Sequence, residues 1–302
     1  MFDPLQRMLA RQQRAFLARN RREWVEHLLR IRDFLGEGLQ RADPEGPTLI
    51  LGAGSGLEIP WAKAPQGTVG WDADPTSRLR TLFRHGRWAP WVFGDLTGAF
   101  APLRSAAQRA VRESWSGRRR RWEIARVRLQ ALLPSLPVEP LPLKAWIQNQ
   151  RPGTILAANF MGQLGPLAQR VVEGAFAPEE PWECDPDEAD PLAEALDLWT
   201  ARLVRALLEV LRESGAELWM VHDRAVLTGD PLPELAAFAP DWRAQLRSPE
   251  PLEIVDPLAG VDVLETIGLP LLRGERWLWP LEPEQLHLVE ALAFELDPHS
   301  GS

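Results

Sequence analysis

The chain has 302 residues, of which 45% are hydrophobic, and a formal net charge of −8 at pH 7. That length can bury a large core as one large domain or two, and no apolar run is long enough to span a bilayer. The negative charge argues against broad binding to nucleic acid. Cys184 is the sole cysteine, which excludes an internal disulfide and a multi-cysteine metal site and favours a reducing, cytoplasmic setting.

The N-terminal region reads as helical from residue 2 to residue 41. Trp24, Leu28, Ile31 and Leu35 recur at helical spacing and form one apolar stripe. We therefore treat residues 1–46 as a helical extension that either covers a ligand site or packs on a sheet. Arginines in its first turns exclude a secretory signal, and a mitochondrial presequence is the alternative. The near-complete use of arginine over lysine is typical of a GC-rich bacterial genome.

A buried strand at 48–51 runs into a glycine-rich turn at 52–56, which suits backbone that must turn sharply or approach a ligand closely. A second strand at 68–72 ends at Asp72, 20 residues after Gly52. That is the spacing of one strand–turn–helix–strand unit, in which the acid accepts hydrogen bonds from both ribose hydroxyls of a nucleoside. The pattern predicts a cofactor that contains adenosine.

The glycines at 52, 54 and 56 read G-x-G-x-G, and a dinucleotide site would need a glycine where this chain has Leu57. The segment resembles motif I of the class I S-adenosylmethionine-dependent methyltransferases. Segments 70–75, 93–96 and 154–160 resemble that family's second-strand end, third-strand end and fourth strand, in the family's order. The resemblance covers roughly residues 48–163. It implies a Rossmann-like α/β sheet with helices on both faces and a closing antiparallel hairpin, over residues 47–302.

The resemblance also implies the cofactor site. Asp72 would hold the ribose, and Asp95 the adenine amino group, with Leu96 adding its backbone N–H. Alternatively, Asp95 merely caps the helix that follows. The full set of predicted cofactor residues is Gly52, Ala53, Gly54, Gly56, Asp72, Ala73, Asp95, Leu96 and Asn159.

Two departures from the family pattern stand out. The family often has an acid two residues before the first glycine, where it helps to hold the methionine ammonium group, and this chain has Ile50. Asn159 matches only the first residue of the N-P-P-aromatic loop of amino-methylating members. Without the prolines, a DNA or glutamine methyltransferase is not indicated.

Two charged segments lie outside the alternating α/β pattern. A helical segment at 102–133 has nine arginines against two glutamates, and a loop at 178–197 has nine acids and no basic residue. Both are expected to be solvated faces. Alternatively, they face each other as a lid near the cleft, or the cluster at 118–121 binds phosphate or an anionic substrate.

The last third of the chain predicts a helix at 191–213 and a fifth strand at 217–222 that ends at His222 and Asp223. Runs at 252–255 and 276–279 suit the closing antiparallel hairpin. At the carboxyl edge of the sheet, His222 could serve as a base for a protonated acceptor, or it is only a hydrogen-bonded strand-end histidine.

The sequence therefore favours an S-adenosylmethionine-dependent methyltransferase, an enzyme that acts on a small-molecule acceptor. The catalytic residue, the acceptor and the oligomeric state stay undetermined, and no metal or membrane is implicated. One alternative is a binding or scaffolding protein that keeps the fold without catalysis. Another is a nicotinamide-dependent oxidoreductase, which the glycine spacing disfavours.

Overall fold

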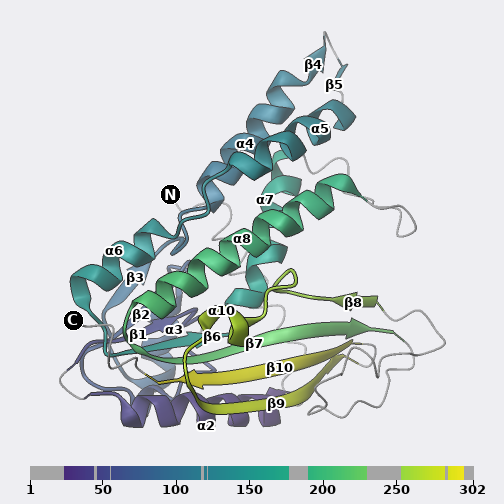
Figure 1. Ribbon diagram of the computed structural model, residues 1–302. Coiled ribbons are helices and arrows are strands. Elements are labelled where there is room, and N and C mark those ends of the chain that lie inside the picture. Colours follow the sequence, from purple (N-terminus) through teal and green to yellow (C-terminus); the bar gives the residue numbers. More distant parts are fainter. Residues whose placement is uncertain are drawn as a thin grey trace.

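A computed structural model describes residues 24–43, 46–54, 56–116, 119–120, 122–176, 190–229, 253–282 and 285–295. The fold is built on one large mixed sheet (Figure 1). Its strand order is β3 (Trp91–Phe93), β2 (Thr68–Asp72), β1 (Thr48–Leu51), β6 (Thr154–Ala158), β7 (Glu217–Thr228), β10 (Gln285–Phe294) and β9 (Leu271–Glu282).

The first five of these strands are parallel, and β10 is antiparallel to both β7 and β9. The chain reverses its direction of travel across the sheet between β3 and β6, which creates a switch point beside β1. This order, with an antiparallel strand inserted before the last one, is that of the class I methyltransferase fold. The Rossmann-like α/β fold predicted from the sequence is confirmed.

The sheet is buried on both faces, which explains the continuous apolar runs of its central strands. Successive side chains of β7 enter different cores: Leu218 and Met220 pack under the large helical layer, whereas Trp219 and Val221 face helix α2 (Trp24–Arg41). The α2 core also holds the 3-10 helix η1 (Trp61–Lys63).

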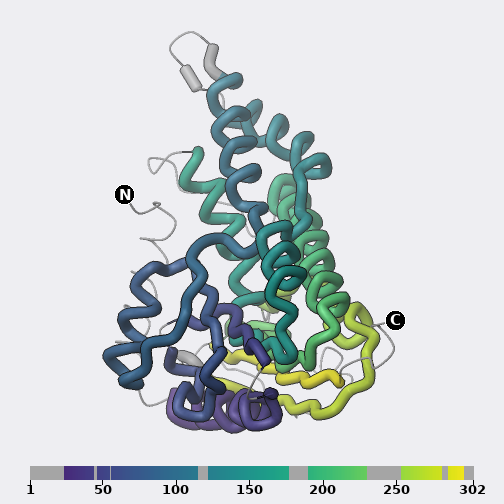
Figure 2. Tube along the Cα trace, turned by 90° about the vertical axis from the view of Figure 1, so that its left-hand side faces the viewer, coloured from purple at the N-terminus to yellow at the C-terminus, as the bar shows by residue number. Residues whose placement is uncertain are grey.

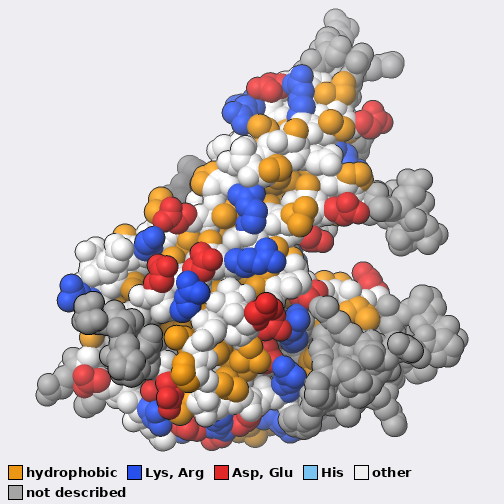
Figure 3. Space-filling model, viewed as in Figure 1, with side chains coloured by type: hydrophobic (Ala, Val, Ile, Leu, Met, Phe, Trp, Pro, Cys, Tyr) orange, Lys and Arg blue, Asp and Glu red, His pale blue; other side chains and the backbone are white. Residues whose placement is uncertain are grey.

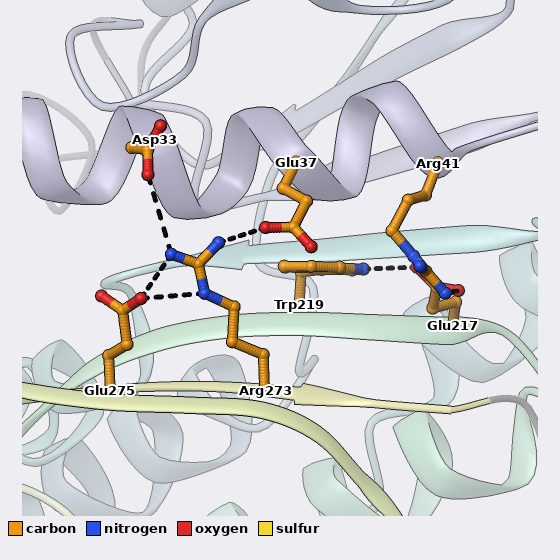
Figure 4. A network of polar contacts seen from close by, with 7 residues as sticks. All are labelled: Asp33, Glu37, Arg41, Glu217, Trp219, Arg273 and Glu275. Carbon is orange, nitrogen blue, oxygen red and sulfur yellow. Dashed lines mark hydrogen bonds and ion pairs between the residues drawn. The ribbon is translucent and has the colours of Figure 1, made fainter.

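Helix α2 is fastened to the sheet by a polar network as well as by its apolar stripe (Figure 4). Arg273 on β9 contacts Glu37 and Asp33 of α2 and Glu275 of its own strand. At the end of the helix, Arg41 pairs with Glu217 of β7 at 3.1 Å, and Trp219 Nε1 donates to the same carboxylate at 2.7 Å. The predicted helix is thus confirmed from residue 24 to residue 41, while 2–23 lie outside the described residues.

The unit between β1 and β2 differs from the prediction. A strand–turn–helix–strand unit was expected, but the connection contains only η1, and the next full helix is α3 (Ser77–His85), after β2. Pro60 and Pro65 flank η1 and remove backbone donors that a longer helix would need. No long helix therefore begins directly after the glycine turn.

The arginine-rich segment is helical as predicted, and it forms two helices. Helices α4 (Phe100–Glu113) and α5 (Trp122–Leu132) are joined by the short hairpin of β4 (Trp115–Ser116) and β5 (Arg119–Arg120). They form an arm that projects away from the sheet beside α7 (Leu164–Phe176) and α8 (Pro191–Glu213) (Figures 1 and 2). The chain returns to the sheet through η2 (Leu133–Ser135) and α6 (Leu141–Gln150).

The arm and the acidic segment meet at the start of α8. Asp190 caps α8 by accepting a hydrogen bond from the Leu192 N–H at 2.9 Å, and it also forms an ion pair with Arg126 of α5. Helix α8 has the bounds predicted from the sequence, and most of its apolar side chains, Trp199 and Leu203 among them, are buried. Acidic residues 179–188 lie outside the described residues, and the β4–β5 hairpin lies at the outer end of the arm (Figure 1). The proposed lid therefore stays a prediction.

The closing hairpin is formed by β9 and β10, so the prediction for 252–255 was wrong. Strand β8 (Glu253–Val255) instead pairs antiparallel with the far end of β7, and it leads to the short helix α10 (Val263–Ile267). The run at 276–279 lies within β9 as predicted. No helix in the described part of the chain is long and apolar enough to cross a membrane.

Candidate functional site

The glycine turn at the carboxyl end of β1 has the positive-φ backbone that its composition predicts. Gly52, Gly54 and Gly56 have φ values of 65°, 50° and 70°, a region in which residues with a side chain are disfavoured. A Cβ on Gly52 would lie 2.5 Å from the Phe160 Cβ and 2.8 Å from the Ala158 carbonyl oxygen. The turn therefore passes tightly under the end of β6.

The turn is also held from the side of α3. The His85 Nε2 lies 2.8 Å from the Gly56 carbonyl oxygen, and a Cβ on Gly56 would meet the Thr81 hydroxyl at 2.9 Å. The third glycine thus lets the turn pack against α3, which follows β2. It does not pack against a helix directly after β1.

Asp72 ends β2 as predicted, and its side chain lies against the turn. Its carboxylate accepts hydrogen bonds from the Gly54 N–H at 2.8 Å and the Asp74 N–H at 2.7 Å. Burial raises the pKa of Asp72, and these two backbone bonds oppose the rise. The Ser77 hydroxyl also donates to this carboxylate at 3.2 Å. Because an ionised carboxylate has about four acceptor positions, about one is left to accept from a ligand. Ala73, beside it, is partly buried.

Asp95 follows β3 as expected, and its side chain engages the start of α4. It accepts from the Thr97 N–H at 2.9 Å, from the Thr97 hydroxyl at 2.6 Å and from the Phe100 N–H at 3.1 Å. Asp95 thus bonds the first N–H of α4 from outside the cap position, which Ala99 occupies, and this resembles the capping role given as the alternative. Leu96 is buried in the large core. The adenine contacts of Asp95 and Leu96 stay predictions.

Asn159 lies directly after β6, beside the glycine turn. Its φ of 45° is unusual for a residue with a side chain, and its N–H donates to the Val221 carbonyl at 2.8 Å. Its Oδ1 is buried and has no hydrogen-bond partner in the described part of the protein. A buried acceptor without a partner is costly, and a ligand that donates a hydrogen bond there would remove that cost.

His222 and Asp223 are not at the end of their strand, because β7 continues to Thr228. The neighbouring β6 pairs with β7 only as far as Val221, so both residues lie just beyond the point where β6 ends. A bulge opposite Leu288 and Val289 accompanies this extension. The end predicted at 222 was wrong, because pairing with β10 and β8 carries the strand past the sheet edge.

His222 is fully buried, and its Nε2 lies 3.2 Å from Glu290 of β10. Glu290 also accepts from Arg276 Nε at 2.6 Å. Burial by itself would raise the pKa of Glu290, but its contacts with His222 and Arg276 outweigh burial and lower it to about 2. With no exposed surface, His222 cannot contact an acceptor in this conformation, so the structure does not support its role as a base.

Asp223 faces the opposite side of the sheet, toward α2. It is 4% exposed, and its Oδ1 has no hydrogen-bond partner of proper geometry among the described residues, although His287 Nδ1 lies 3.3 Å away. His27 of α2 lies in the same cluster, stacked on Trp279 at 3.7 Å. Burial lowers the pKa of His27 to about 3, so this histidine is neutral.

Glu58 was missed by the sequence reading. It is the only acid between Gly52 and Gly67, and it is partly buried in the loop after the glycine turn. Burial, Asp223 and Asp72 together raise the pKa of Glu58 to about 7, whereas Arg32 opposes the rise. A single glutamate in a loop has no periodicity, so only its closeness to the glycines could have drawn attention to it.

The carboxyl edge of β1, β2, β6 and β7 therefore holds a tight glycine turn, the buried Asn159 oxygen and the carboxylates of Asp72 and Asp223. Carboxylates accept hydrogen bonds and favour cations, so the site suits a ligand with hydroxyls and positive charge. A dinucleotide carries a negative pyrophosphate, which binds best at the N-terminus of a helix. That helix is replaced here by a loop with Glu58.

Comparisons with known proteins add little to this geometry. No protein-family model and no curated protein matches the chain. One solved structure, described as a "DhpI-SAM-HEP complex", aligns with 93% of this chain and 95% of its own at 12% identity, with a TM-score of 0.33. The fold of this chain is defined by its own strand order and pairing.

Proposed function

We propose that this protein is an S-adenosylmethionine-dependent methyltransferase that acts on a small-molecule acceptor. One observation carries the proposal: the turn of positive-φ glycines after β1 is joined to Asp72 of β2 by the hydrogen bond from the Gly54 N–H. It lies at the switch point of a sheet with the order of the class I methyltransferase fold, where ligands of such sheets bind.

The chain's residues would bind the cofactor in three parts. The glycine turn would approach it closely, Asp72 would accept from its ribose hydroxyls, and Asn159 would accept from its amino-acid part through the buried Oδ1. When bound, S-adenosylmethionine supplies an activated methyl group. The protein then has mainly to align the acceptor with that carbon and to exclude water.

An enzyme that also needs a base would have to use a residue other than His222. This leaves a non-catalytic binding protein as the second candidate, because His222 is enclosed and paired with Glu290. A nicotinamide-dependent oxidoreductase is disfavoured by the missing helix after the glycine turn. The lone cysteine continues to favour a cytoplasmic protein.

Calorimetric titration of the full chain separates these candidates. S-adenosylhomocysteine should bind with one site per chain, and NAD should not bind. A methyltransferase should then convert S-adenosylmethionine to S-adenosylhomocysteine with an acceptor from a panel of small molecules, whereas a binding protein should not. Tight binding of NAD with no binding of S-adenosylhomocysteine would refute the proposal.

A further inference from the structure

The loop between the glycine turn and β2 contains only the short η1, so no full helix satisfies its backbone carbonyls. Side chains from outside the loop donate to several of them. Arg32 of α2 donates its Nε to the Leu57 carbonyl at 2.6 Å. Arg87, just beyond the end of α3, donates to the carbonyls of Trp61, Ala64 and Pro65. The conformation of this loop therefore depends on groups that lie elsewhere in the chain.

The glycine turn at the start of this loop is fixed by its own backbone donors. The Ala53 N–H donates to the Trp71 carbonyl of β2 at 3.3 Å. The Gly54 N–H donates to Asp72. The Gly56 N–H donates back to the Ala53 carbonyl at 3.0 Å. These donors hold the turn to β2 and to itself, whereas the carbonyl of Gly56 bonds to another element.

Helix α3 supplies the partner of that carbonyl. The His85 Nε2, on the last residue of the helix, lies 2.8 Å from the Gly56 carbonyl oxygen. A carbonyl can only accept, so Nε2 must carry the proton. Burial lowers the pKa of His85 below its ordinary value, although the bond to Gly56 opposes the change. His85 is therefore neutral at pH 7, with its single ring proton on Nε2.

The other end of α3 contacts the acid of the same site. The Ser77 hydroxyl, on the first residue of the helix, donates to Asp72 at 3.2 Å. Helix α3 thus reaches Asp72 with its first residue and the glycine turn with its last. The close approach at the turn requires Gly56, because a Cβ there would lie 2.9 Å from the Thr81 hydroxyl oxygen. One helix therefore sets how Asp72 and the glycines lie relative to each other.

We propose that His85 is a positioning residue of the cofactor site: its hydrogen bond to the Gly56 carbonyl holds the glycine turn in the place, relative to Asp72, that binds the ligand. The proposal rests on the proposed function. His85 acts through the turn, and it is assigned no contact with the ligand and no part in methyl transfer. Without this bond the far end of the turn can move away from α3, and ligand binding then has to order it again.

The test replaces His85 with one residue that cannot donate and with one that can. In His85→Leu, affinity for S-adenosylhomocysteine, measured by calorimetry, should fall about two- to tenfold, which is the net effect of one hydrogen bond. His85→Gln should restore the affinity, because its amide nitrogen also donates and lies about as far along the side chain as Nε2. The loss in His85→Leu should be equal for 5′-methylthioadenosine, which keeps the adenosine and the thioether but lacks the amino-acid part.

Arg87→Leu is the matched control, because it removes hydrogen bonds to the same loop without touching the glycine turn. It should lower the urea midpoint of unfolding at least as far as His85→Leu, but it should leave affinity for S-adenosylhomocysteine unchanged. Glu139→Gln, which alters an exposed acid that pairs with Lys144, should change neither. If affinity simply follows stability across these variants, the role of His85 is only structural and the proposal is overturned.

The remaining outcomes separate this proposal from the proposed function. Equal affinity in wild type and His85→Leu, or an equal loss in His85→Leu and His85→Gln, would overturn the positioning role and leave the cofactor site intact. Failure of the wild-type protein to bind S-adenosylhomocysteine would instead refute the proposed function. His85 is partly exposed, so its variants should fold. The comparison between them decides the matter even if Arg87→Leu does not fold.

Discussion

The two sides of the candidate site are built in different ways. On one side, a turn of three glycines and the acid at the end of β2 are joined by a single hydrogen bond within 18 residues of sequence. On the other, His222 and Asp223 of β7 face Glu290 and His287 of β10, more than 60 residues later. The first side depends on local backbone conformation, and the second on the pairing of distant strands. Mutations should therefore damage them in different ways.

The largest effect should come from Gly52→Ala. The substitution places a Cβ in positive-φ backbone and drives it against Phe160 and the Ala158 carbonyl. Backbone strain and overpacking together should lower the free energy of unfolding by about 2–5 kcal/mol. Urea unfolding measures the change.

Gly86→Ala is the matched control. Gly86 ends α3 with a φ of 63°, but a Cβ there would meet nothing within 4 Å. The free energy of unfolding of Gly86→Ala should fall only by the cost of the positive-φ backbone, about 1–2 kcal/mol. If both variants lose the same free energy of unfolding, close packing of the turn against β6 contributes nothing to stability.

The contribution of the β10 side to the free energy of unfolding should be measurable at acid pH. The pKa of Glu290 is lowered from 4.5 to about 2, so its stabilising contribution is present above about pH 4.5 and is lost as the pH falls toward 2. Between pH 5 and pH 3, the free energy of unfolding should fall by about 2 kcal/mol through this group alone. Urea unfolding of Glu290→Gln at both pH values should lack this part of the fall. An identical fall in variant and wild type would contradict the pairing with His222 and Arg276.

Asp72→Ala should weaken ligand binding more than it weakens the fold. The charge-assisted hydrogen bonds that Asp72 would make with the ribose are each worth roughly 1.5–3 kcal/mol. Affinity for S-adenosylhomocysteine should drop at least about tenfold in calorimetry, in contrast to the control Glu139→Gln. Unchanged affinity would remove the ribose assignment and with it the centre of the proposed function.

The smallest effect is expected at the arm, which belongs to neither side. Arg126→Ala removes the ion pair with Asp190, a contact that is partly open to solvent and worth about 0–1 kcal/mol. If the charged segments form a lid, the variant should also reduce the salt dependence of S-adenosylhomocysteine binding. Salt dependence equal to that of the wild type would favour a simple solvated face.

The same difference between local and distant contacts explains what the sequence could predict. The positions of the glycine turn and of Asp72 at the end of β2 follow from spacing within one stretch of chain, and helices α2 and α8 follow from periodicity. These positions, α8 and the described part of α2 were predicted correctly, while the binding roles of the glycines and Asp72 stay predictions. The extension of β7 and the true partner of β9 depend on pairing between strands, which no single stretch specifies. The missing helix before β2 illustrates a further limit, because spacing alone cannot tell a helix from an ordered loop.

The double pairing of β7 has a consequence for how the site would respond to a ligand. One edge of β7 is bonded to β6 and then to β8, and the other to β10, so few of its amides can open without disrupting the whole sheet. Hydrogen exchange should therefore be slowest along β7 and faster in the loop around Glu58. The loss of conformational entropy on ligand binding should fall almost entirely on that loop, because β7 is already ordered.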